Sequence, residues 1–229
     1  MKLNEIEHIY FDLDHTLWDF DKNSALAFEQ MFTKRKLSLR IEDFLEVYVP
    51  VNYKYWELYR DNLVSKEDLR FGRLKDSFDL LKIEASTQTI NELSIEYIEF
   101  LPVNNHLLEG SLEILNYLKP KYKLHIITNG FEEVQHKKLT NSGISDFFST
   151  VTTSEEAGVK KPHAHIFDTA LKKANTLPSK SLMIGDNLEA DVKGARDFGM
   201  STIYFDYYKK NADVGEIQIQ TLNELRGYL

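Results

Sequence analysis

The sequence predicts an α/β fold, in which a parallel sheet with helices on both faces carries an inserted all-helical segment. Residues 18–103 have apolar side chains at three- and four-residue spacing and hardly any strand signal. From residue 104 onward, short apolar runs alternate with amphipathic stretches, and strands separated by helices form parallel sheets with covered faces. We therefore expect a core built from residues 1–17 and 104–229, and a helical cap made by residues 18–103.

The first strand is the apolar run at residues 9–11, and four helices are expected in the insert after it. Ser65, with Asp68 three positions later, has the pattern of a capped helix start. Pro102 marks the return to the core, where helix and strand begin to alternate. By residue number, the four helices cover about 22–32, 44–56, 66–81 and 89–100.

The core elements follow from apolar runs and from their stop signals. Gly143 and Gly199 each stand where a helix is expected to end, because glycine accepts a left-handed backbone at little cost. The predicted helices cover residues 108–118, a segment ending at 143, residues 163–174 and a segment ending at 199. The predicted strands end near residues 127, 153, 184 and 205.

Composition narrows the functional classes. The chain has 229 residues, 42% of them hydrophobic, and 28 basic against 36 acidic residues give a net charge of −8, which argues against a partner with a nucleic-acid backbone. Zero cysteines exclude disulfides, thiolate catalysis and cysteine-ligated zinc. The amino terminus has no apolar signal region and no stretch is long enough to span a bilayer, so we expect a soluble, cytoplasmic protein without a membrane partner.

Polar side chains follow the first strand directly, as Asp12, Asp14 and Thr16. In an extended chain alternate side chains share a face, so the two carboxylates are expected to converge at the strand exit, where open α/β sheets place their ligands. Oxygen ligands this sparse suit Mg²⁺, which keeps several waters and shares its shell with substrate phosphate. Taken alone, the same triplet fits an ordinary turn equally well.

Three later segments again place polar groups after apolar strand-like runs. Thr128 and Asn129 follow one run, Asp186 follows another with Asp191 beyond it, and Lys160-Lys161-Pro162 lies between them. A single site at one edge of the sheet can receive all of these groups.

This order resembles the haloacid dehalogenase-like (HAD) hydrolase superfamily, whose motifs run Asp-x-Asp-x-Thr, Ser/Thr, Lys, and Gly-Asp with a further acidic residue. The resemblance spans nearly the whole chain and implies a Rossmann-like core. Residues 126–131 and 154–162 are similar to the branch of pyrimidine 5'-nucleotidases, which act on nucleoside monophosphates.

The resemblance implies roles for the first motif and the metal. Asp12 is expected to attack phosphorus and become aspartyl phosphate, ionised because Mg²⁺ and a lysine lower its pKa. Asp14 is expected to protonate the leaving oxygen and then to activate water. The carboxylates of Asp12 and Asp186, with the backbone carbonyl of Asp14, are the expected Mg²⁺ ligands. Thr16 is expected to brace the turn after the nucleophile.

The resemblance also implies how the phosphate is held. Thr128 and Lys161 are the expected donors to its oxygens, with backbone amides near Asn129. We prefer Lys161 to Lys160 because the family's lysine directly precedes proline. Asp191 is expected to orient Lys161 or a metal-bound water.

Substrate choice is expected to reside in the cap, since the core contacts only the phosphate. Asn52, Trp56 and Arg73 are the candidates, by stacking on a base or bonding its edge. The expected substrate is a small phosphorylated metabolite, and the preferred candidate is a pyrimidine nucleoside 5'-monophosphate. Alternatives are a 2-haloacid dehalogenase, against which Asp14 argues, a phosphoglycolate or sugar-phosphate phosphatase or mutase, and an inactive binding module. The sequence leaves the oligomeric state open.

Overall fold

The structure, a computed structural model, describes residue 3, residues 5–209, residue 215 and residues 217–229. Its described residues form two compact units. One is made by residues 1–20 together with 105–229, and the other by residues 21–104.

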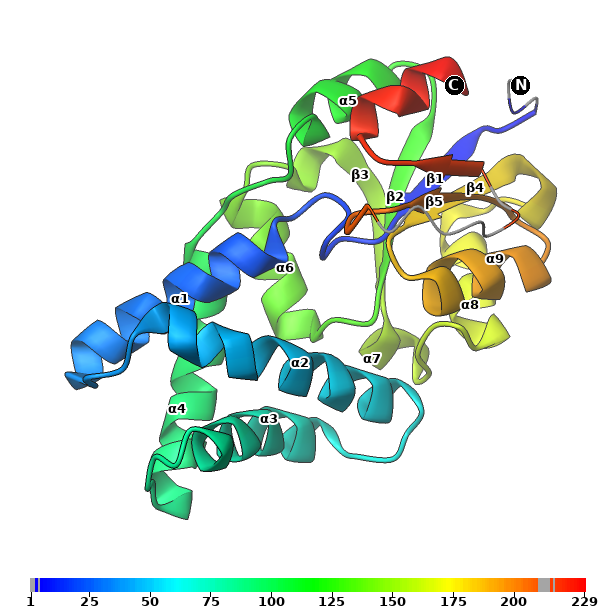
Figure 1. Cartoon of the computed structure of the whole chain (residues 1–229). Helices are drawn as coiled ribbons and strands as arrows, with labels where there is room; N and C mark the ends of the chain where they lie inside the picture. The colour runs from blue at the N-terminus through cyan, green and yellow to red at the C-terminus, as the bar shows by residue number, and fades with distance from the viewer. Residues whose placement is uncertain (1–2, 4, 210–214, 216) are drawn as a thin grey trace. The chain divides into compact units, whose positions relative to one another are not determined.

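The first unit is built on a sheet in which the described strands are all parallel (Figure 1). The strand order is β3-β2-β1-β4-β5-β6, so β1 lies between β2 and β4 in the middle of the sheet. The strands are β1 (His8–Phe11), β2 (Lys123–Thr128), β3 (Phe148–Thr153), β4 (Ser181–Gly185), β5 (Ser201–Phe205) and β6 (Ile217–Ile219).

Helices cover both faces of this sheet, as expected for parallel strands that are apolar along their whole length. All residues of β1 and β4 are buried. Figure 1 shows α5 on one face and α8 and α9 on the other, where Tyr10, Phe167 and Met183 belong to one buried cluster. The core helices are α5 (Ser111–Leu118), α6 (Glu132–Asn141), α7 (Ser154–Ala157), α8 (Ala164–Ala174) and α9 (Gly194–Asp197).

The predicted α/β fold is confirmed, and the observed helices and strands differ from the predicted ones only locally. The helix expected to end at Gly199 begins as a π-helical turn over Leu188–Lys193 and continues as α9. Gly143 and Gly199 have φ of +69° and +97°, the left-handed conformation expected after a helix. The short edge strand β6 and a 3-10 helix at Leu222–Gly227 were not predicted.

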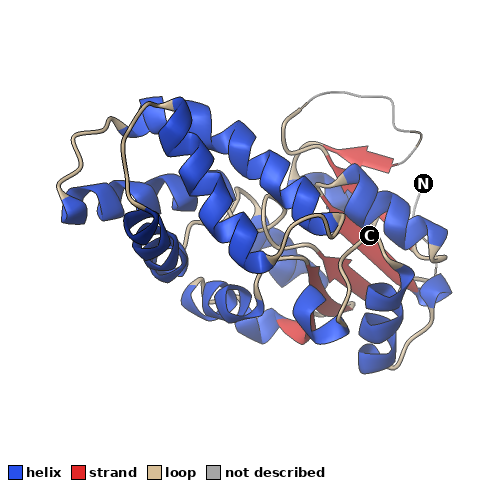
Figure 2. Cartoon of the chain, turned by 90° about the horizontal axis from the view of Figure 1, so that it is seen from below, coloured by secondary structure: helices blue, strands red, loops and turns tan. Residues whose placement is uncertain are grey.

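The second unit is helical, and Figure 2 draws its helices in blue like those of the first unit. Its helices are α1 (Phe20–Arg35, of which the first residue belongs to the other unit), α2 (Ile41–Arg60), α3 (Lys66–Leu80) and α4 (Thr87–Phe100). The Phe28 ring packs against Phe44, Tyr48 and Tyr97 at centroid distances of 4.7, 4.5 and 4.3 Å. Phe28 and Phe44 are among the apolar positions whose spacing predicted these helices. Ser65 and Asp68 form the predicted reciprocal cap of α3.

Within the described residues, none of the helices combines the length and the apolar character that crossing a bilayer requires.

Candidate active site

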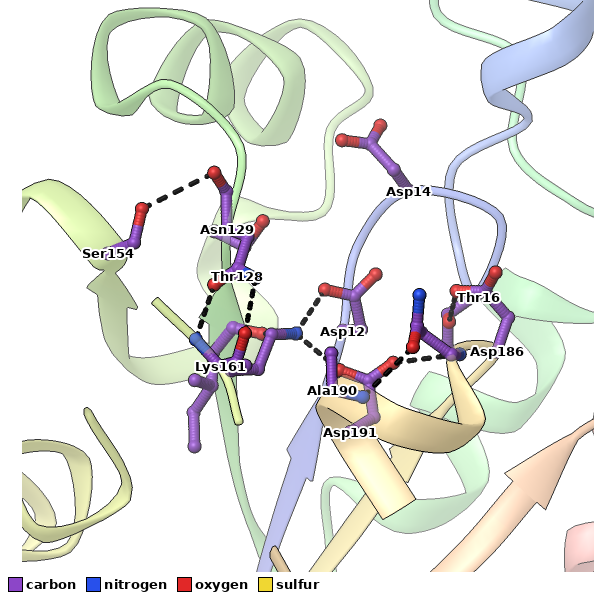
Figure 3. A network of polar contacts seen from close by, with 12 residues as sticks. Asp12, Asp14, Thr16, Thr128, Asn129, Ser154, Lys161, Asp186, Ala190 and Asp191 are labelled. Carbon is purple, nitrogen blue, oxygen red and sulfur yellow. Dashed lines mark hydrogen bonds and ion pairs between the residues drawn. The ribbon is translucent and has the colours of Figure 1, made fainter. Parts of the chain in front are cut away.

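The site lies where the three central strands end (Figure 3). Phe11, the last residue of β1, pairs with Ile126 of β2 and Ile184 of β4. Asp12, Thr128 and Asp186 therefore emerge next to one another, because neighbouring parallel strands end at the same edge of a sheet.

Lys161 is at the centre of the polar network. Its side chain is 2% exposed, and its Nζ lies 2.6 Å from Asp12 Oδ1, 2.6 Å from Asp191 Oδ1 and 2.7 Å from the carbonyl oxygen of Ile127. The Asn129 side chain fixes the backbone of this lysine from both sides. Its Oδ1 accepts from the Lys161 N–H at 2.8 Å, and its Nδ2 donates to the Lys161 carbonyl at 3.0 Å. The Asn129 side-chain amide thus positions the backbone of Lys161, and donation from a backbone amide near Asn129 to a phosphate stays a prediction.

Asp12, Asp186 and Asp191 form an acidic cluster, each with a carboxylate oxygen within 4.8 Å of the others. Asp191 is held from two sides, by Lys161 at Oδ1 and by the Asn187 N–H at 3.0 Å from Oδ2. This packing depends on Gly185, since a Cβ there would lie 2.3 Å from Asp191 Oδ2. Asp191 therefore contacts Lys161, one of the two groups that it was expected to orient, and its role there stays a prediction.

The charge of this cluster fits a divalent cation. Burial raises the pKa of Asp12 well above its usual range, and Asp191 and Asp186 add to that rise while Lys161 opposes it. Burial likewise raises the pKa of Asp186 to about 7. Two buried carboxylates and the partly buried Asp186 thus share one ammonium group, and the lowering of the Asp12 pKa expected beside Mg²⁺ stays a prediction. A hard cation bound by oxygens relieves this repulsion.

The Thr128 hydroxyl accepts two hydrogen bonds from its surroundings. Its side chain is buried, and its Oγ1 accepts from Gln135 Nε2 at 2.6 Å and from the Gly130 N–H at 3.0 Å. Both bonds use oxygen lone pairs, so the hydroxyl keeps its own hydrogen for donation, and its donation to a phosphate stays a prediction.

Asp14 does not converge with Asp12 as strand alternation predicted. The strand ends at Phe11, and Asp14 turns away from the acidic cluster in Figure 3. Its Oδ1 lies 2.5 Å from Lys138 Nζ, and its Oδ2 accepts from Gln135 Nε2 at 3.1 Å. The sequence did not point to these two residues of α6, although their three-residue spacing places them on one side of a helix.

Comparison with known proteins identifies the family. Residues 6–199 match the family model described as haloacid dehalogenase-like hydrolase. The chain belongs to this hydrolase family. It is 32% identical to pyrimidine 5'-nucleotidase YjjG of Escherichia coli, over 95% of this chain and 93% of that one, and 33% identical to glyceraldehyde 3-phosphate phosphatase of Pyrococcus abyssi, over 89% and 83%. The structure of Bacillus subtilis YfnB bound to magnesium superposes with a TM-score of 0.89 at 26% identity, covering 98% of both chains.

Thr16 lies beside the acidic cluster of this HAD-like hydrolase. Its buried hydroxyl donates to Asp186 Oδ1 at 3.3 Å, so it holds the proposed metal ligand in addition to standing in the turn after Asp12. His15 Nδ1 lies 4.0 Å from the other oxygen of Asp186 and opposes the rise in its pKa.

The cap candidates occupy the helical unit of the hydrolase. Asn52 Oδ1 accepts from Arg73 Nη1 at 2.9 Å and from the Tyr48 hydroxyl at 3.3 Å. The Arg73 side chain is buried, and its guanidinium lies 4.9 Å from the centroid of Tyr97. Trp56 packs edge-on against Tyr59 at 5.7 Å. The structure thus brings Asn52 and Arg73 together, and their part in substrate recognition stays a prediction.

Proposed function

We propose that this hydrolase is a Mg²⁺-dependent phosphatase that acts on small phosphomonoesters through an aspartyl phosphate at Asp12, with pyrimidine nucleoside 5'-monophosphates as its substrates. The observation that carries the proposal is the buried Lys161 Nζ, 2.6 Å from Asp12 and from Asp191, with Asp186 in the same acidic cluster. This arrangement supports a nucleophile beside a metal site better than a structural ion pair, because three carboxylates share one ammonium group where the strands end.

In the proposed reaction Asp12 is the nucleophile. Its Oδ1 is held by Lys161, which leaves Oδ2 to attack phosphorus. The transferring group carries its charge on three oxygens, so fixed donors around it contribute most of the stabilisation. Thr128 donates its hydroxyl hydrogen to one of these oxygens, and Lys161 supplies a positive charge beside them.

Asp14 completes the reaction as acid and then as base. In its protonated form it gives its proton to the ester oxygen as the bond from that oxygen to phosphorus breaks. The carboxylate so formed then removes a proton from the water that hydrolyses the aspartyl phosphate, which returns Asp14 to the protonated form. Asp14 Oδ2 and Thr128 Oγ1 accept from the same nitrogen of Gln135, which supports a position of the acid beside the phosphate.

Mg²⁺ is the proposed cofactor, held by the carboxylates of Asp12 and Asp186 and by the backbone carbonyl of Asp14. When bound, it neutralises charge on the phosphate oxygens and on the carboxylates. The magnesium-bound YfnB structure, which matches this chain along nearly its whole length, supports this choice.

The relatives support a phosphomonoester substrate and favour two classes of it. The similarity to a pyrimidine 5'-nucleotidase covers 95% of this chain. The comparable identity to a glyceraldehyde 3-phosphate phosphatase makes a triose phosphate the second candidate. The half-buried Asn52 has an amide donor that suits the carbonyl oxygens of a pyrimidine, and the buried Arg73 holds the Asn52 side chain through its Oδ1. Asn52, Trp56 and Arg73 are therefore the proposed recognition residues.

A phosphate-release screen tests the proposal. The panel contains uridine and thymidine monophosphates, purine monophosphates, glyceraldehyde 3-phosphate and phosphoglycolate, with halide release from a 2-haloacid measured in parallel. We expect Mg²⁺-dependent turnover that is highest on the pyrimidine nucleotides and absent in Asp12→Asn. A preference for the triose phosphate would replace the substrate assignment alone, and metal-independent halide release would refute phosphatase function.

A further inference from the structure

Two side chains of α6 hold the Asp14 carboxylate by both of its oxygens. Lys138 Nζ lies 2.5 Å from Oδ1, and Gln135 Nε2 lies 3.1 Å from Oδ2. With a donor on each oxygen, the carboxylate is held in one orientation instead of rotating freely about its side-chain bonds.

The ammonium group of Lys138 is buried, which distinguishes this ion pair from a surface pair. The side chain is 2% exposed, and its Nζ lies 4.2 Å from the ring centroid of Trp18 and 5.3 Å from that of Phe20. Exposed ion pairs contribute little because water and side-chain entropy compete with them. A lysine buried between aromatic rings instead keeps its charge through a fixed partner, and Asp14 provides that partner here.

Gln135 connects Asp14 to the phosphate donor Thr128. It is fully buried, and its Nε2 donates to Thr128 Oγ1 at 2.6 Å as well as to Asp14. The chain makes room for this amide at Gly130, where a Cβ would lie 2.2 Å from Gln135 Nε2. The absence of a side chain at position 130 is thus required by the link between Thr128 and Asp14.

We propose that Lys138 and Gln135 are positioning residues for acid–base catalysis, which hold the Asp14 carboxylate in register with the phosphate bound at Thr128. This inference rests on the proposed phosphatase function and on the role of Asp14 within it. Both residues act through Asp14 and do not contact the substrate themselves. A carboxylate released from them reaches the leaving oxygen in fewer of its orientations, so the proton-transfer step slows while phosphate binding remains.

The test compares two esters that differ in their need for an acid. Departure of a nucleoside alkoxide requires protonation, whereas p-nitrophenolate leaves with little help. The parameter kcat/KM reports the steps up to departure of the leaving group. We expect Lys138→Met to lower kcat/KM by about 10²-fold on uridine monophosphate and only a few-fold on p-nitrophenyl phosphate. The matched control is Lys137→Met, an exposed lysine on the same helix, which leaves both values unchanged.

Three further variants separate positioning from a structural role. Lys138→Arg restores a cation and is expected to recover most of the activity on uridine monophosphate, and Lys138→Gln is expected to lie between the arginine and methionine variants. Added to Asp14→Asn, the change Lys138→Met is expected to have no further effect on kcat/KM. If Lys138→Met fails to fold by circular dichroism, the arginine and glutamine variants carry the same two-ester comparison.

The outcomes distinguish a failure of the positioning role of Lys138 from a failure of the acid–base role proposed for Asp14. If Asp14→Asn keeps wild-type kcat/KM on uridine monophosphate, the acid–base role of Asp14 itself is refuted. If Asp14→Asn is impaired but Lys138→Met behaves like Lys137→Met, only the positioning role is overturned. An equal fall on both esters, or additive effects in the double variant, would show a structural role for Lys138 and would also overturn the inference.

Discussion

Replacing Lys161 with methionine is expected to destabilise the protein as well as to inactivate it. Its Nζ touches Asp12 Oδ1, Asp191 Oδ1 and the Ile127 carbonyl, each within 2.7 Å. Burial by itself lowers the pKa of Lys161, but Asp12 and Asp191 more than offset it and leave the pKa above its ordinary value. A raised lysine pKa means that the ammonium stabilises the fold at every pH below the ordinary lysine value, so its contribution is fully present at neutral pH.

The size of the effect follows from what remains after the substitution. Methionine fills a similar volume but leaves two buried carboxylates without their cation, and breaking a buried pair in this way costs about 3–5 kcal/mol. For a chain of this size each kcal/mol corresponds to about 2–4 °C, so we expect Tm to fall by about 10 °C in EDTA. Added Mg²⁺ should recover part of that loss, because a cation can compensate the same carboxylates.

Thermal unfolding followed by circular dichroism, in EDTA and in Mg²⁺, measures this effect. Lys160→Met is the matched control, since burial lowers the pKa of this half-buried lysine, whereas the pKa of Lys161 is raised. A Tm for Lys161→Met within about 2 °C of wild type in EDTA would refute the argument that this lysine compensates the cluster.

Three other changes test separate parts of the structure. In the wild type, Mg²⁺ at a hundredfold excess over Kd is expected to raise the unfolding free energy by about 2.7 kcal/mol. Asp186→Asn is expected to abolish this rise in a thermal-shift titration, whereas the control Glu189→Gln, at an exposed position, retains it. Gly130→Ala should lower kcat on the order of 10²-fold by displacing Gln135. Gly227→Ala, whose Cβ would have nothing within 4 Å, is the control, and equal kcat values for the two variants would contradict the close packing at Gly130. Burial lowers the pKa of His125 from 6.5 to about 3, so the unfolded chain takes up a proton first as pH falls below 6.5 and stability declines by up to about 1.4 kcal/mol per pH unit. His125→Gln should flatten this decline in urea titrations between about pH 6.5 and 4, and an unchanged slope would show that other groups cause it.

The fold was predictable where local pattern and burial agree. The central strands are continuous apolar runs because both of their faces are covered, and the cap helices repeat their apolar residues at helical spacing. The edge strand β6 was missed because Ile-Gln-Ile over residues 217–219 is too short to give a periodicity. The π-helical turn that carries Asp191 was missed because its extra residue per turn leaves no pattern in the sequence.

The sequence predicted which residues gather at the site better than it predicted how they are arranged. The order of the motifs pointed to Asp12, Thr128, Lys161 and Asp186, which the topology brings to one edge of the sheet. Strand alternation misplaced Asp14, because the extended conformation stops at Phe11.

The partners of the acid show the limit of sequence reasoning. Lys138 lies 124 positions from Asp14 in the sequence, and no local rule links a lysine on a later helix to a carboxylate in the first loop. The rise in the pKa of Asp12 caused by the protein alone escapes sequence reasoning for a related reason. The rise depends on how many carboxylates are buried together around Lys161, which only the folded structure reveals.

The most direct test of the account is to locate the phosphoryl group during turnover. The enzyme is mixed with Mg²⁺ and p-nitrophenyl phosphate, quenched in acid within the first turnover and digested for mass spectrometry. We predict one phosphoryl group on the peptide that contains Asp12, absent in Asp12→Asn and accumulating in Asp14→Asn, where its hydrolysis is blocked. Steady turnover with no phosphoryl group on that peptide, or the same label in Asp12→Asn, would contradict the claim that Asp12 is the nucleophile.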